Sequence, residues 1–342
     1  MPSSRRPPVG RPPRSSAPRG PGSRGRPPAS EMTTTERSRN ERTPEDRSPK
    51  QGAPNRRASK QRRPKERSRK QQPPTERRRR SDLGARILVA VPAAIALVIL
   101  IDLGGLVFAL FVVALGWACM HELYRMLERW KPVTVVGFGA LAGMVLAARY
   151  GGLQQVTEVA VCALPVLFLF VLARPQRGGG TVAIAGTLLG IYWIGFALAH
   201  GELLRELPHG ATVLIDVLLG TFLGDTAAYV GGRLFGRRPL APQISPNKTV
   251  EGLGCGMLIA VLAVYIAGVY QPWLTTGNAL LLGIAVAVLG PIGDLFESLI
   301  KREARTKDTG TLFGAHGGAL DRADAALFTI VAGYYIWYAV IH

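Results

Sequence analysis

The chain has 342 residues and a formal net charge of +19, from 42 Lys and Arg against 23 Asp and Glu. Of these, 25 basic and seven acidic residues lie in residues 1–81, so the remainder of the chain is nearly neutral. The basic isoelectric point therefore describes the N-terminal part and says nothing about the rest. Three cysteines, Cys119, Cys162 and Cys255, stand singly in apolar runs, which excludes a disulfide framework and a cysteine-rich zinc site.

Residues 1–82 are rich in Pro, Arg, Ser and Gly and contain almost no large apolar side chains. Such a segment cannot bury enough apolar surface to fold, so we expect a disordered cytoplasmic tail. The first thirty residues contain no apolar segment, so we do not expect a signal peptide there. The basic clusters at 61–70 and 77–80 are expected to contact anionic lipid headgroups and to anchor the topology. Nucleic acid is the disfavoured partner, since no aromatic residue interleaves the tail to stack on bases.

The remainder, residues 83–342, has the pattern of a polytopic membrane protein. Most of its apolar segments approach the roughly 20 residues that span a bilayer. We therefore expect an all-α integral membrane protein with about nine transmembrane helices. The predicted segments are 86–101, 103–122, 133–149, 157–173, 181–200, 210–232, 250–270, 276–300 and 322–341.

Loop charges predict the orientation of these segments. With a cytoplasmic N-terminus the even-numbered loops should be cytoplasmic and basic. Those loops carry 14 Lys and Arg, whereas the odd-numbered loops offer only Arg149 and Arg205. The count predicts that the N-terminus is cytoplasmic, that the C-terminus lies outside, and that both motif-bearing loops face the cytosol. We expect the protein in the cell (inner) membrane.

The strongest functional signal is the ionic stretch 294–324, which lies between two membrane-length apolar runs. Charged residues in such a position are costly and point to a functional site. On a helix, Asp294, Glu297, Ser298 and Lys301 share one face at i, i+3, i+4 and i+7, and Asp321 and Asp324 are also three residues apart. Three aspartates, at 294, 321 and 324, predict a site for a hard cation such as Mg²⁺. The alternative is a charged loop at the membrane surface.

A second polar group lies in the segment 224–251. Asp225 places a carboxylate inside an apolar run, and Ser245, Asn247 and Lys248 precede the next apolar segment. A helix start offers free N–H groups to a phosphate, and Lys248 adds a positive charge there. A capped helix start with topological arginines explains the same pattern without a ligand.

Taken in order, the blocks resemble those of phosphatidate cytidylyltransferases (CDP-diacylglycerol synthases). The resemblance covers about residues 84–342 and is strongest in 224–324. It is carried by the sequences at 225–229, 245–252, 298–308 and 316–324, namely Asp-Thr-Ala-Ala-Tyr, Ser-Pro-Asn-Lys-Thr-Val-Glu-Gly, Ser-Leu-Ile-Lys-Arg with Lys307-Asp308, and His-Gly-Gly followed by Asp-Arg-Ala-Asp. Ala319 and Ala323 depart from the family, where larger aliphatic side chains are usual.

The resemblance implies a membrane enzyme that condenses CTP with phosphatidic acid, giving CDP-diacylglycerol and pyrophosphate. It implies that residues 83–342 are the catalytic domain and that Mg²⁺, with a second cation considered, is the cofactor. By motif position, Asp294, Asp321 and Asp324 are the expected metal ligands, and Lys248 and Lys301 join them as catalytic residues. Expected substrate-binding residues are Asp225, Ser245, Asn247, Arg302, Lys307, His316 and Arg322.

Three alternatives remain at the level of sequence, and the weakest is a scaffold built on the basic tail, which would leave the aspartates within the apolar segments unexplained. Another CTP- or metal-dependent membrane lipid transferase would share the nucleotide and cation chemistry, and only its lipid and product would differ. A transporter would also place carboxylates within its spans, but we find no internal repeat that matches 224–251. The oligomeric state is not defined by the sequence; a homodimer is the assembly considered.

Overall fold

A computed structural model describes residues 91–174, 178–306, 309–310 and 317–342. Within these ranges the protein is helical apart from one short β-hairpin. The expected disordered tail, Lys307 and His316 lie outside the described residues.

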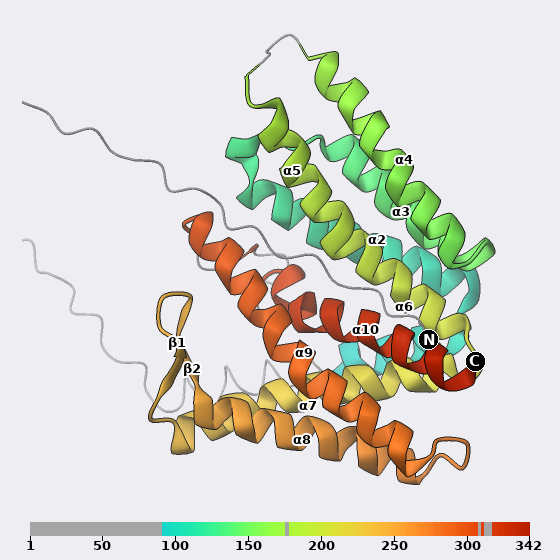
Figure 1. The fold of residues 1–342 in the computed structure, drawn as a ribbon, viewed down its shortest axis with the longest axis vertical. Helices are drawn as coiled ribbons and strands as arrows, with labels where there is room; N and C mark the ends of the chain where they lie inside the picture. The colour runs from blue at the N-terminus through green and yellow to red at the C-terminus, as the bar shows by residue number, and fades with distance from the viewer. Residues whose placement is uncertain (1–90, 175–177, 307–308, 311–316) are drawn as a thin grey trace, which may run out of the picture. The chain divides into compact units, whose positions relative to one another are not determined.

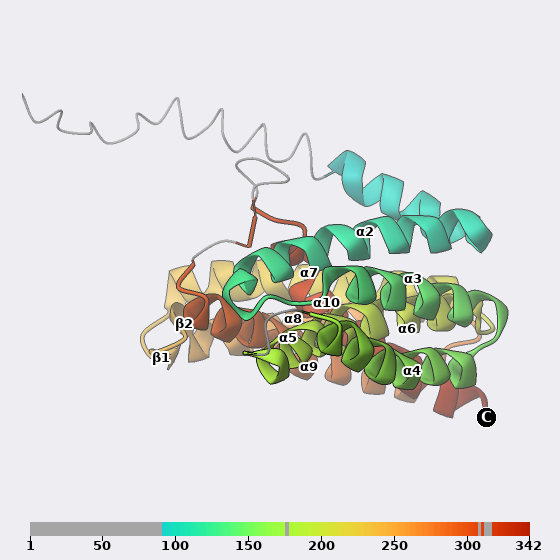
Figure 2. The same cartoon turned by 90° about the horizontal axis from the view of Figure 1, so that it is seen from above.

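The described N-terminal half is built from five apolar segments, the first of which leads directly into the second (Figures 1 and 2). The fifth is a 27-residue helical span, Gly180–Glu206, whose middle, Ile191–Gly195, is π-helical. The elements are a helix over Val91–Leu103, α2 (Gly105–Met126), the 3₁₀ turn η1 (Glu128–Trp130), α3 (Thr134–Tyr150), α4 (Leu153–Leu172), α5 (Gly180–Gly190), η2 (Ile191–Gly195) and α6 (Phe196–Glu206).

The C-terminal half contains four helices, with the hairpin between the first two. They are α7 (Gly210–Phe235), β1 (Pro239–Ala241), β2 (Ser245–Thr249), α8 (Val250–Val269), α9 (Thr276–Glu303) and α10 (Leu320–Ile341). Helices α7, α8 and α9 pack on one another. Helix α10 lies between the two halves and contacts α9 and α7 on one side and α6 and α2 on the other (Figure 1).

The described helices confirm the nine apolar segments expected from the sequence. Seven are long and apolar enough to cross a membrane by length and composition. The other two are shorter, namely Val91–Leu103 and the 17-residue α3. Helix α3 packs against α4, α6 and α2.

Small residues allow α7 and α8 to approach closely. A Cβ atom added at Gly256 would lie 2.7 Å from the Cβ of Ala228 and 2.8 Å from the backbone oxygen of Gly224. A Cβ added at Gly252 would lie 2.7 Å from the backbone oxygen of Ala228. Small residues that bring backbones together are the usual means of helix association in membranes. The contact fixes the start of α8 against the C-terminal half of α7, where the hairpin is attached.

Polar contacts gather at the two ends of the bundle. At one end Arg149 pairs with Glu206 at 3.0 Å, and Gln271 donates a hydrogen bond to Asp216 at 2.8 Å. There the Arg205 guanidinium also donates to the backbone oxygen of Ile101 at 3.1 Å. The other end carries the hairpin and the ends of α9 and α10 that are joined in sequence. The described site residues predicted from the sequence lie at this end.

Candidate functional site

Three carboxylates from α9 and α10 form a compact cluster. One ligand atom each from Asp294, Glu297 and Asp324 lies within 4.8 Å of the others. Glu297 is fully buried and Asp324 is 8% exposed, while Asp294 is half-buried. Because carboxylates are acceptor-only when ionised, such a cluster is costly without a positive charge between or beside them.

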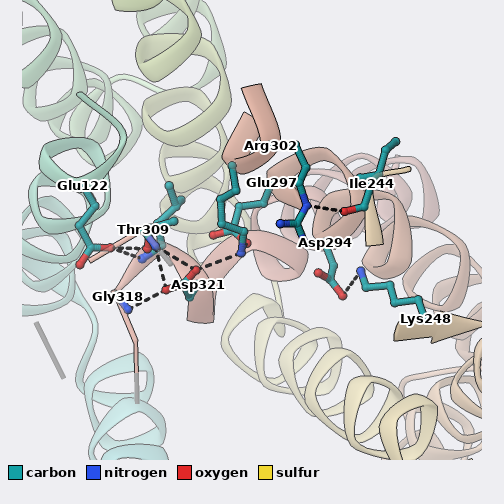
Figure 3. Close-up of polar contacts among 11 residues, drawn as sticks. Glu122, Ile244, Lys248, Asp294, Glu297, Arg302, Thr309, Gly318 and Asp321 are labelled. Atoms are coloured by element: carbon teal, nitrogen blue, oxygen red, sulfur yellow. Dashed lines mark hydrogen bonds and ion pairs between the residues drawn. The ribbon is translucent and has the colours of Figure 1, made fainter. Parts of the chain in front are cut away.

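Lys248 supplies one such charge from the hairpin. At the end of β2 its ammonium group forms an ion pair with Asp294 (Figure 3). Asp225, on the facing helix α7, interacts electrostatically with both Asp294 and Lys248. The structure thus brings together two sequence blocks that lie about 70 residues apart. A ligand bound between Lys248 and Asp294 would contact both blocks.

Lys301 supplies a second charge from within α9. Its ammonium group pairs with Glu297 one turn away and with Asp321 of α10 at 3.0 Å. Asp321 also accepts hydrogen bonds from the backbone N–H groups of Gly318, at 2.8 Å, and Thr309, at 3.2 Å (Figure 3). Asp321 therefore sits beside the acidic cluster as an anchor for loop backbone at the start of α10.

The hairpin is held in place by the sequence block around Thr249. The Thr249 side chain caps α8 by accepting a hydrogen bond from the N–H of Gly252 at 3.1 Å. Glu251 accepts from the N–H groups of Arg237 and Arg238, at 3.0 and 3.2 Å, which ties the start of the hairpin to its end.

Helix α9 binds the other side of the hairpin. The Arg302 Nε donates to the backbone oxygen of Ile244, in the hairpin turn, at 2.9 Å (Figure 3). Together with the Thr249 and Glu251 contacts, this fixes the approach of Lys248 to Asp294. The hairpin was not expected from the sequence, which suggested a stiff loop leading to a helix.

The structure also places three further predicted site residues. Ser245 is half-buried and Asn247 is exposed, both on β2. Arg322 is exposed in the first turn of α10. Lys307 and His316 lie outside the described residues, so their predicted contacts with substrate remain predictions.

The structure adds two carboxylates that sequence reasoning did not select for the site. Glu297 was recognised as part of the polar stripe on α9 but not as a ligand; the geometry makes it the third member of the cluster in place of Asp321. Glu122, near the end of α2, is 4% exposed and accepts hydrogen bonds from Thr309 and from the N–H of Leu320. Its one sequence signal is a carboxylate at the end of an apolar run.

Chemically, the cluster suits a hard divalent cation. Such ions prefer carboxylate oxygens and keep coordination positions for water or phosphate oxygens. Glu297 Oε1 is buried and has no hydrogen-bond partner among the described residues, which leaves an acceptor available for a cation. Acidic ligands flanked by Lys248, Lys301 and Arg302 are the arrangement expected for phosphoryl or nucleotidyl transfer.

Comparison with known proteins shows which family the chain belongs to. The sequence matches the cytidylyltransferase family over residues 84–340. It is 33% identical over 267 residues to the phosphatidate cytidylyltransferase of Bacillus subtilis, covering 75% of this chain and 97% of that protein. It is 28% identical over 273 residues to the phosphatidate cytidylyltransferase of Mycobacterium bovis, covering 76% of this chain and 89% of that protein. This multi-pass membrane protein therefore belongs to the cytidylyltransferase family.

Proposed function

We infer that the protein is a phosphatidate cytidylyltransferase, which transfers the cytidylyl group of CTP to phosphatidic acid. The observation that carries this inference is the acidic cluster of Asp294, Glu297 and Asp324, with Lys248 and Lys301 paired to it. The family match covers the whole of the region that builds this site. The products are CDP-diacylglycerol, a phospholipid precursor, and pyrophosphate.

The reaction forms one P–O bond and breaks another. A phosphate oxygen of phosphatidic acid attacks the α-phosphorus of CTP, and the bond from that phosphorus to the bridging oxygen breaks as pyrophosphate leaves. Phosphatidic acid is already ionised at neutral pH, so the attacking oxygen needs no general base. Catalysis then depends on positioning two anions and on neutralising their charge.

Asp294, Glu297 and Asp324 are the residues that we propose to hold Mg²⁺. A bound divalent cation would stabilise negative charge that develops on the phosphate oxygens. The sequence predicted Asp321 as the third ligand. Asp321 lies beside the cluster, where it pairs with Lys301. In our proposal Asp321 orients Lys301 and the backbone at Gly318, and Glu297 takes the ligand position.

The basic residues have separable roles. Lys248 and Lys301 are placed to balance the carboxylates and to meet the triphosphate or the lipid phosphate as point charges. Arg302 uses its Nε to hold the hairpin at Ile244, and its remaining guanidinium N–H groups are proposed to face phosphate. Asp225, Ser245, Asn247, Lys307, His316 and Arg322 complete the proposed substrate contacts.

We propose that this end of the bundle faces the cytosol, where CTP is found, in the cell membrane. The basic loops predicted from the sequence belong to this end: Arg129 of η1 donates to the backbone oxygen of Glu303, and Arg174 donates to that of Lys131, at 2.7 and 2.8 Å. Residues 83–342 are the proposed catalytic domain. Contact of the tail with anionic headgroups and a homodimeric assembly are further proposals.

The direct test uses purified protein in detergent with CTP, phosphatidic acid and Mg²⁺, and measures pyrophosphate and the lipid product by mass. Equal amounts of pyrophosphate and CDP-diacylglycerol are expected, and the Asp324→Asn variant should form neither. Release of CDP, with transfer of a phosphate to a lipid hydroxyl, would identify a CTP-dependent lipid kinase instead. Turnover with an isoprenoid phosphate but not with phosphatidic acid would also reject the proposal.

A further inference from the structure

Glu122 stands out because it is a buried charge that the reaction does not require. It lies on α2, in the N-terminal half of the chain, and is 4% exposed. None of the described residues forms an ion pair with it. A carboxylate in such a place is costly unless hydrogen bonds compensate for the lost water.

The compensating hydrogen bonds come from Thr309, in the connection between α9 and α10, and from Leu320, the first residue of α10. Glu122 Oε2 accepts from the hydroxyl of Thr309 and from the backbone N–H of Leu320, both at 3.0 Å (Figure 3). Thr309 and Leu320 are themselves buried. The N–H of Leu320 is one of the donors at the start of α10 that have no partner within the helix. A carboxylate there also interacts favourably with the positive end of the helix dipole.

Gly310 and Gly318 lie directly against the Glu122 carboxylate. A Cβ atom at Gly318 would overlap Glu122 Oε2, and one at Gly310 would overlap Oε1. Glycine at both positions lets the backbone of these two residues approach the carboxylate closely.

The 3₁₀ turn that follows α2 contacts the end of α9. Arg129, seven residues beyond Glu122 and in η1, donates a hydrogen bond to the backbone oxygen of Glu303 at 2.7 Å. Glu303 is the last residue of α9, where carbonyl groups lack helical partners. Glu122 thus holds the start of α10, and Arg129 holds the end of α9.

We propose that Glu122 is a positioning residue of the nucleotidyl-transfer site, which fixes the start of α10 and thereby the placement of Asp321 and Asp324 relative to α9. Asp321 and Asp324 lie one and four residues after Leu320, within the first turns that Glu122 holds. The inference rests on the proposed function, because it assigns Glu122 a part in the same site. It gives α2 a role in catalysis although none of its described side chains belongs to the acidic cluster.

The test compares Glu122→Gln, Glu122→Ala and the matched control Glu128→Gln, an exposed carboxylate on η1. Glu122→Gln keeps the volume and one acceptor oxygen, so the fold should persist while the backbone bond weakens. Loss of a group that orients metal ligands typically costs about 10- to 100-fold in metal affinity or activity. We expect a loss of kcat of that size and a higher Mg²⁺ requirement, with a smaller change in the KM for CTP. Glu122→Ala should lose more, and Glu128→Gln should match the unaltered protein.

A second measurement separates this proposal from the proposed function. Hydrogen–deuterium exchange of the peptide containing Leu320 should accelerate in Glu122→Gln relative to Glu128→Gln, whether or not the protein turns over CTP. Unchanged exchange at this peptide, or unchanged kcat and Mg²⁺ dependence in an active enzyme, would overturn the positioning role. A fall in activity that only follows the fraction of unfolded protein, measured by melting in detergent, would overturn it as well. If the unaltered protein has no activity but exchange is faster in Glu122→Gln, the proposed function is rejected. The role of Glu122 in holding the start of α10 is then retained.

Discussion

Lys301 neutralises two carboxylates at once, Glu297 in its own helix and Asp321 in the next. Its side chain is 15% exposed, and that of Glu297 is 1% exposed. Removing one partner of a buried ion pair leaves an uncompensated charge, which typically destabilises a protein by about 3–5 kcal/mol. We therefore expect Lys301 to support the stability of the site as well as its proposed chemistry.

For Lys301→Met we expect a lower melting temperature in detergent together with loss of turnover. The double variant Lys301→Met with Glu297→Gln should regain much of the stability, because the buried charge is removed with its partner, and it should remain inactive. Melting temperature and CDP-diacylglycerol formation are measured on the same preparations. Equal stability of the single and the double variant would contradict the coupling.

Cation binding should distinguish the ligands from the anchor. Asp294→Asn, Glu297→Gln and Asp324→Asn should each lower turnover by orders of magnitude and weaken Mn²⁺ binding, measured by paramagnetic resonance as a substitute for Mg²⁺. Asp321→Asn should also lower turnover, through Lys301 and the loop backbone, but should keep Mn²⁺ binding. Asp102→Asn, at the opposite end of the bundle, is the control. Loss of Mn²⁺ binding in Asp321→Asn alone would restore the ligand set predicted from the sequence.

The sequence predicted the chemistry of individual residues better than their partners. Asp294 and Asp324 could be selected because carboxylates within apolar helical patterns are costly. Glu122 could not, since its partner Thr309 lies 187 residues away and no local pattern predicts that contact. The exchange of Asp321 for Glu297 in the cluster depends on how α10 packs against α9, which spacing along one helix does not define.

At the scale of elements, apolar length predicted the helices and missed the hairpin. Each of the nine segments corresponds to a described helix, and seven of these are long and apolar enough to cross a membrane. Long apolar runs predict helices because the lipid requires them whatever their partners. Strands β1 and β2 have only three and five residues, and each contains a proline, Pro239 or Pro246. Thr249 is their only β-branched residue, so neither shows the pattern that predicts a strand. The hairpin forms through Glu251 and Arg302, which hold it from outside.

Two threonine caps allow a matched experiment on the hairpin. Thr249 caps α8 and Thr275 caps α9, each through its side-chain oxygen. Loss of such a cap costs about 1 kcal/mol, so Thr249→Val and Thr275→Val should lower stability similarly. Only Thr249→Val should raise the KM for CTP, because that cap adjoins Lys248. An equal effect of both variants on KM would contradict a specific role of the hairpin in substrate binding.

At the scale of the whole molecule, the charge divides the chain into a basic N-terminal segment and a nearly neutral remainder. The family match begins at residue 84, beyond that basic segment. A chain that starts at Ser81 is therefore expected to keep its kcat and KM in detergent, measured against the full-length protein. Reduced membrane insertion is compatible with this expectation, because the basic cluster at 77–80 can anchor topology. Loss of turnover in an inserted and folded protein of this length would show that the tail takes part in catalysis.

The last prediction concerns orientation, which connects both ends of the bundle to the compartments they face. Exposed positions suit cysteine labelling at each end: Gln243 in the hairpin turn and Gly277 at the start of α9, where an added Cβ atom meets nothing within 4 Å. The background needs Ser at Cys162, which is exposed on α4, and at Cys255. In intact cells a membrane-impermeant maleimide should label Gly277→Cys and leave Gln243→Cys unlabelled, and permeabilisation should make both reactive. The 14 basic residues of the even-numbered loops motivate this result, since Lys and Arg resist export across the membrane. Labelling of Gln243→Cys in intact cells would place the acidic cluster away from cytosolic CTP, and the predicted orientation would be wrong.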